Sequence, residues 1–100
     1  MDRVEAAALL RNEMTEYAGR PRAALTRLIG QTDAYGVQGP GEASYQVEVN
    51  AYWDDEIDGT IRVIGSIDDG GFRSSFGPLT DGFLMSADGS VDAPDPGAPA

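Results

Sequence analysis

The chain has 100 residues and a formal net charge of −10, because seven arginines stand against seventeen aspartates and glutamates. It contains no lysine, histidine or cysteine, which excludes a Ser-His-Asp triad, a thiolate nucleophile, a disulfide and an ordinary zinc site. At this length we expect one domain with one modest hydrophobic core.

The first residues do not have the pattern of a secretory signal peptide. Asp2, Arg3 and Glu5 precede an apolar run that already ends at Arg11. No stretch approaches the roughly 18 apolar residues that a membrane span needs. We therefore expect a cytoplasmic protein without membrane contact.

Two helices are predicted before residue 30. Residues 2–18 are helix formers, and Ala6, Leu10, Met14 and Tyr17 recur at helical spacing and form a single stripe. Asp2 can cap this helix and Gly19 can end it. Pro21 suits the first turn of a second helix over 21–29. Together the two segments predict a helical hairpin, or one kinked helix.

A glycine-rich segment separates the helices from the strands. Residues 30–43 hold four glycines and one proline and are predicted to form a loop. From residue 44 the apolar period is two, which predicts a strand over 44–53 that places Trp53 at the edge of the core. The acidic hairpin loop 54–59 then leads into a second strand over 60–67.

The last third of the chain is predicted to complete the sheet. The sequence Asp68-Asp69-Gly70-Gly71 favours a tight turn before a third strand over 72–77. Residues 82–86 follow as a fourth strand or one helical turn. Residues 88–100 are rich in proline, glycine and aspartate and are predicted to be a tail, so the domain spans 1–87. The expected fold class is α+β, an N-terminal helical hairpin packed on a three- or four-stranded antiparallel β-meander.

The negative charge is concentrated in the predicted sheet. Residues 44–100 carry nine of the ten net negative charges. Phosphates would be repelled by this half, whereas a protein partner with a basic surface would be attracted, so we expect no direct binding of nucleic acid. The candidate partner-binding residues lie at the hairpin ends and on the polar sheet face: Tyr52, Asp54, Asp55, Glu56, Asp58, Asp68 and Asp69.

The same acids admit other interpretations. Residues 54–61 match the first part of a calcium-binding loop, but Gly65 stands where that loop requires a bidentate glutamate. The pair Asp68 and Asp69 could perform acid–base chemistry, as paired carboxylates do in glycosidases. Residues 54–61 and the pair Asp68 and Asp69 can equally be ordinary turns exposed to solvent. We predict no catalytic residue, no metal and no cofactor.

Residues 61–71, with Pro78-Leu79-Thr80 and Phe83 after them, resemble small acidic bacterial α+β domains. With the helix pair and the meander, the chain is similar to immunity proteins of bacterial toxin systems and to phage-encoded inhibitors of bacterial defence, anti-CRISPR proteins among them. The likeness covers residues 45–85 and rests on turn-forming motifs, so no site residue is carried over. It implies a non-enzymatic inhibitor of a toxin or a nucleic-acid-binding effector, with carboxylates standing where phosphates would lie.

Two alternatives stand beside this expectation. The chain could be a homodimeric structural or regulatory module that pairs through an uncovered sheet face or through the edge at residues 72–76. An enzyme that uses a carboxylate-bound metal comes third.

Overall fold

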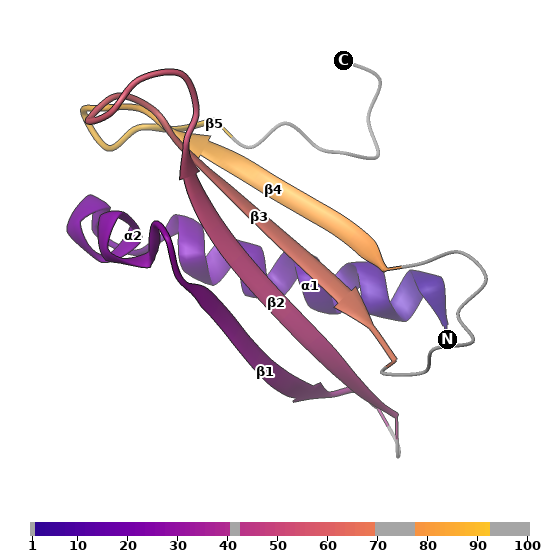
Figure 1. The fold of residues 1–100 in the computed structure, drawn as a ribbon. Helices are drawn as coiled ribbons and strands as arrows, with labels where there is room; N and C mark the ends of the chain where they lie inside the picture. Colours follow the sequence, from indigo (N-terminus) through magenta and orange to yellow (C-terminus); the bar gives the residue numbers. More distant parts are fainter. Residues whose placement is uncertain (1, 41–42, 70–77, 93–100) are drawn as a thin grey trace.

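Two helices lie against one face of a five-stranded antiparallel sheet whose strands follow the chain in the order β1-β2-β3-β4-β5 (Figure 1). The computed structural model describes residues 2–40, 43–69 and 78–92. The predicted α+β class, with helix packed on meander, is confirmed. The element bounds are α1 Arg3–Ala18, α2 Arg22–Leu28, β1 Thr32–Gln38, β2 Ser44–Trp53, β3 Ile61–Asp68, β4 Leu79–Met85 and β5 Val91–Asp92.

Helix α1 covers the sheet over β3 and β4. Its buried residues are the predicted stripe, Ala6, Leu10, Met14 and Tyr17. At its start the Asp2 carboxylate accepts a hydrogen bond from the amide of Glu5 at 3.0 Å, as an N-cap does. Gly65 of β3 lies beneath the helix. A Cβ at this position would overlap Met14 Sδ and lie 3.2 Å from Leu10 Cδ1, so the missing side chain lets the helix approach the sheet closely.

Helix α2 contacts β2 and β3, and it buries Leu25 and Leu28. Pro21 precedes it in an extended conformation, where its fixed φ and missing amide proton cost nothing. After the helix the chain turns at Gly30, whose φ of 85° favours glycine. The second predicted helix is therefore present.

Strand β1 corrects the prediction that residues 30–43 form a loop. Thr32–Gln38 pairs antiparallel with β2, in the register Tyr35 to Val47. Its side chains alternate between exposed and half-buried, with Asp33, Tyr35 and Val37 turned inward. The alternation was hidden by the small exposed residues, Gly36 among them, which an edge strand tolerates.

The far edge of the sheet also differs from the prediction. The predicted fourth strand over 82–86 is β4, which begins earlier, at Leu79, and ends at Met85; the alternative of a helical turn is wrong. Val91 and Asp92, predicted as part of the tail, form β5 and pair with Met85 and Leu84. Within the described residues, the sheet therefore has five strands, where three or four were predicted. The predicted strand over 72–77, the turn glycines 70–71 and the tail residues 93–100 lie outside the described residues.

The sheet has two different faces. The inner face, toward the helices, carries the buried residues of β2 and β3: Tyr45, Val47, Val49, Ala51, Ile61, Val63 and Ile67. On the opposite face, here called the outer face, side chains are exposed or half-buried, as in Glu48, Tyr52 and Arg62. No helix of the described chain packs on the outer face (Figure 1).

Candidate functional site

The predicted acidic hairpin is formed by the loop between β2 and β3. Its backbone closes through the amide of Asp54 on the carbonyl of Thr60 at 2.8 Å and that of Gly59 on the carbonyl of Glu56 at 3.1 Å. Asp58 has a φ of 69°, a left-handed conformation that aspartate tolerates better than most residues. Turn geometry thus accounts for part of the acidic composition.

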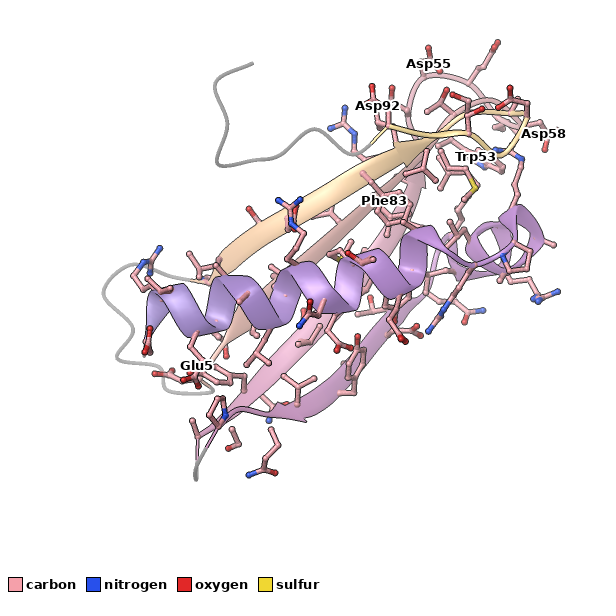
Figure 2. All side chains as sticks on the ribbon, turned by 180° about the vertical axis from the view of Figure 1, so that it is seen from behind. Glu5, Trp53, Asp55, Asp58, Phe83 and Asp92 are labelled. Atoms are coloured by element: carbon pink, nitrogen blue, oxygen red, sulfur yellow. The ribbon has the colours of Figure 1, made fainter. Side chains whose placement is uncertain are left out.

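A second loop brings further carboxylates to the same end of the sheet. Asp88 lies in the turn between β4 and β5, and Asp92 lies on β5. Figure 2 shows Asp92 at the end of the molecule that also holds Asp55 and Asp58. We call this set the acidic end; its members are Asp54, Asp55, Glu56, Asp58, Asp88 and Asp92. Asp88 and Asp92 were not among the candidate binding residues predicted from the sequence, because residues 88–100 were predicted to form a tail.

Arg22 holds the two loops of the acidic end together. Its guanidinium donates to the carbonyls of Asp58 at 3.1 Å and Gly59 at 2.8 Å in one loop, and to that of Ser86 at 3.2 Å in the other. The same group lies over the ring of Trp53, 5.7 Å from its centroid. Because Arg22 stands at the start of α2, the helical hairpin fixes the acidic end.

Within the part of the chain that the structure describes, Asp54 is the carboxylate of the acidic end that forms an ion pair. Its Oδ1 lies 2.9 Å from Arg62 Nε and 2.7 Å from a terminal nitrogen of the same guanidinium. In the register of β2 and β3, Arg62 lies opposite Tyr52, and Glu48 lies opposite Ser66. Hydrogen bonds from the Ser90 hydroxyl and amide lower the pKa of Asp88, which keeps this carboxylate ionised.

Exposed apolar side chains accompany these carboxylates. Among the described residues, four large hydrophobic side chains are exposed: Val4, Tyr52, Ile57 and Val91. Three of them belong to the acidic end or border it, with exposed fractions of 50% for Tyr52, 76% for Ile57 and 40% for Val91. An aromatic and two aliphatic side chains left in solvent beside carboxylates form a composition typical of interfaces.

The seven predicted site residues do not form one cluster. Tyr52, Asp54, Asp55, Glu56 and Asp58 lie together, whereas Asp68 and Asp69 come at the other end of β3. There Asp69 and Asp2 lie close enough to Tyr45 to contribute to its electrostatic environment. Asp68 and Asp69 both already interact within the chain. The predicted surface is thus divided between the two ends of the sheet.

Three tyrosines link the helices and strands through carboxylates, an arrangement that the sequence did not indicate. Tyr17 donates to Asp33 at 2.7 Å, Tyr35 to Glu13 at 2.8 Å, and Tyr45 to Glu5 at 2.8 Å. The bond to Glu5 and burial raise the pKa of Tyr45 to about 12. Burial, followed by the carboxylate bond, raises the pKa of Tyr17 and of Tyr35. The donor and acceptor are 16 to 40 residues apart in sequence, so only folding pairs them.

An ion pair with a buried carboxylate and a partly exposed guanidinium lies between α1 and β4. Arg11 Nε is 2.9 Å from Asp81 Oδ2, and the Asp81 side chain is only 8% exposed. The other oxygen of Asp81 accepts from the amide of Gly82 at 2.8 Å. These residues border a cavity of about 190 Å³ between helix and strand. Both carboxylate oxygens are satisfied, which indicates a structural role for the pair.

No group of three or more His, Cys, Asp or Glu side chains in residues 2–40, 43–69 and 78–92 is arranged to hold a metal ion. Within the same ranges, no helix is long and apolar enough to cross a membrane. The chain gave no match to any protein-family model, to any curated protein or to any solved structure.

Proposed function

We propose that the chain is a non-enzymatic binding protein that covers a basic site on a partner protein through its acidic end. The observation that supports this most strongly is the coincidence of exposed Tyr52, Ile57 and Val91 with the six carboxylates of that end. Apolar side chains supply contact area, and carboxylates supply selectivity for cationic partners. A nucleic-acid-binding toxin or effector is the class of partner that fits, since its site is built to receive phosphates.

The fixed backbone of the acidic end favours this proposal. Arg22 ties both loops to α2, so little ordering of the backbone would remain to be done on binding. Carboxylates presented on a preformed loop can take the places of phosphate oxygens in front of arginine or lysine side chains. The concentrated negative charge would also accelerate encounter with a basic partner.

The proposal is tested by a matched pair of charge reversals. Glu56→Lys changes an exposed carboxylate of the acidic end, and Glu16→Lys makes the same change on the exposed side of α1. We expect Glu56→Lys to weaken partner capture by about tenfold or more, and Glu16→Lys to leave it near that of the wild type. Capture is quantified from an extract of the native host by mass spectrometry, over a series of salt concentrations.

Two further measurements complete this test. The purified partner should lose nucleic-acid binding when the wild-type chain is added and keep it with Asp55→Lys/Glu56→Lys. Association should also slow as salt rises. Equal capture by Glu56→Lys and the wild type would refute the assignment of the binding surface to the acidic end.

A homodimer formed through the sheet is the second candidate. The outer face carries half-buried Ile64 and Leu84, and no helix of the described chain covers it. Light scattering after size exclusion distinguishes the two, because a stable dimer without a foreign partner favours the second candidate.

A further inference from the structure

The outer face carries an apolar hollow beside the acidic end. It has a volume of about 260 Å³ and is lined by Arg62, Val63, Ile64, Gly82, Phe83 and Leu84. In the sheet register, Gly82 pairs with Ile64, and Leu84 pairs with Arg62. The hollow thus lies between β3 and β4, in the part of the sheet that leads to the acidic end.

Gly82 is the reason for the hollow. A Cβ at this position would lie 2.6 Å from the carbonyl oxygen of Val63, which is backbone and cannot move aside. The position therefore stays without a side chain, while Ile64 and Leu84 stand beside it, both half-buried. An aliphatic side chain from outside would contact both and remove their remaining surface from water.

Carboxylates lie on the two strands that flank the hollow. Asp92 lies on β5 directly opposite Leu84, and Glu48 lies on β2 diagonally across from Ile64, whose direct partner is Asn50; both carboxylates are exposed. The cation at the hollow, Arg62, is already paired with Asp54. A second copy of this face would place like charges opposite each other, whereas a cationic segment would find an acceptor on either side.

We propose that the outer hollow takes a large aliphatic side chain from a cationic segment of the partner, with arginine or lysine on both sides of that side chain. This deepens and rests on the proposed function, because it names the partner element that would extend from the acidic end over the sheet. The acidic end attracts and selects a cationic partner, and the hollow buries one aliphatic side chain of that partner.

The probe is a short fluorescein-labelled peptide in which Arg and Leu alternate with Ser, compared with one in which Ser replaces every Leu. Binding is measured by fluorescence anisotropy. We expect saturable binding of the Leu peptide to a monomeric protein and at least about tenfold weaker binding of the Ser peptide, because one leucine side chain is buried. Comparing peptides leaves the protein unchanged, so this arm does not depend on how any variant folds.

Protein variants locate the contact. Ile64→Ser should weaken the Leu peptide by about tenfold, while Val4→Ser, which changes an 83% exposed side chain on α1, should not. Equal binding of the two peptides would overturn the proposal. A dimer that Ile64→Ser dissociates would overturn it in favour of a second copy on this face.

The two proposals can fail separately. If Glu56→Lys abolishes capture of the native partner and Ile64→Ser leaves it intact, the acidic end binds and the hollow does not. If Glu56→Lys captures as well as the wild type, the proposed function fails, whatever the peptides show.

Discussion

Replacing Arg22 by methionine tests whether the helical hairpin holds the acidic end in place. The change keeps an unbranched apolar stem but removes the donors to the carbonyls of Asp58, Gly59 and Ser86 and the contact with Trp53. The bond to Gly59 is half-buried, and the other two are exposed.

The expected loss of stability follows from these contacts. A hydrogen bond from a charged donor contributes about 1.5–3 kcal/mol where it is shielded, and exposed bonds contribute much less. We therefore expect Arg22→Met to lower the free energy of unfolding by about 2 kcal/mol. For a domain of this size, that corresponds to a fall in Tm of roughly 8–16 °C.

The measurement is urea unfolding followed by circular dichroism and by the fluorescence of Trp53, the chain's single tryptophan. Arg27→Met is the matched control, because Arg27 is an exposed arginine of the same helix. Hydrogen exchange should quicken in residues 54–60 and 86–90 of Arg22→Met only. If the two variants unfold at the same urea concentration, Arg22 does not hold these loops.

Two more predictions concern the interior. Gly65→Ala should lower the free energy of unfolding, measured by urea unfolding, by about 1–3 kcal/mol, because the new Cβ would overlap Met14 Sδ. Gly36→Ala is the control and should not lower it, because a Cβ there meets only ordinary contacts. Equal stability of the two variants would show that α1 can move away from the sheet without loss of stability. The second prediction concerns the hydrogen bond from Tyr45 to Glu5, which holds the pKa of Tyr45 near 12, above the ordinary value of 10.0. The contribution of this bond to stability is therefore fully present below pH 10 and is lost as the pH rises through about 12. Unfolding and tyrosine absorbance near 295 nm, followed together over that range, check this, and an unchanged alkaline transition in Tyr45→Phe would contradict it.

Elements with a clear hydrophobic period could be predicted from the sequence. The buried stripe of α1 and the alternation of β2 and β3 leave little choice of conformation or of buried face. Strand β1 was missed because the small residues at its exposed positions, such as Ala34 and Gly36, hide the period of two. Its inward residues are held by bonds such as that of Tyr35 to Glu13. Pairing with β2 and contact with α1, both long-range, decide this segment.

The candidate site shows the same division. The sequence by itself determined that the protein is acidic, that its charge lies in the sheet half and that Asp54–Asp58 form an exposed turn next to Tyr52. The predicted strand over 60–67 also separated Asp68 from this turn. Tertiary structure alone decided that Asp92 lies at the same end of the sheet as the turn, because antiparallel pairing brings alternate strand ends together at one end. It also decided that Arg22 holds the turn. The bonds of Arg22 reach carbonyls that are 36 and 64 positions away in the sequence, so they depend on where α2 packs.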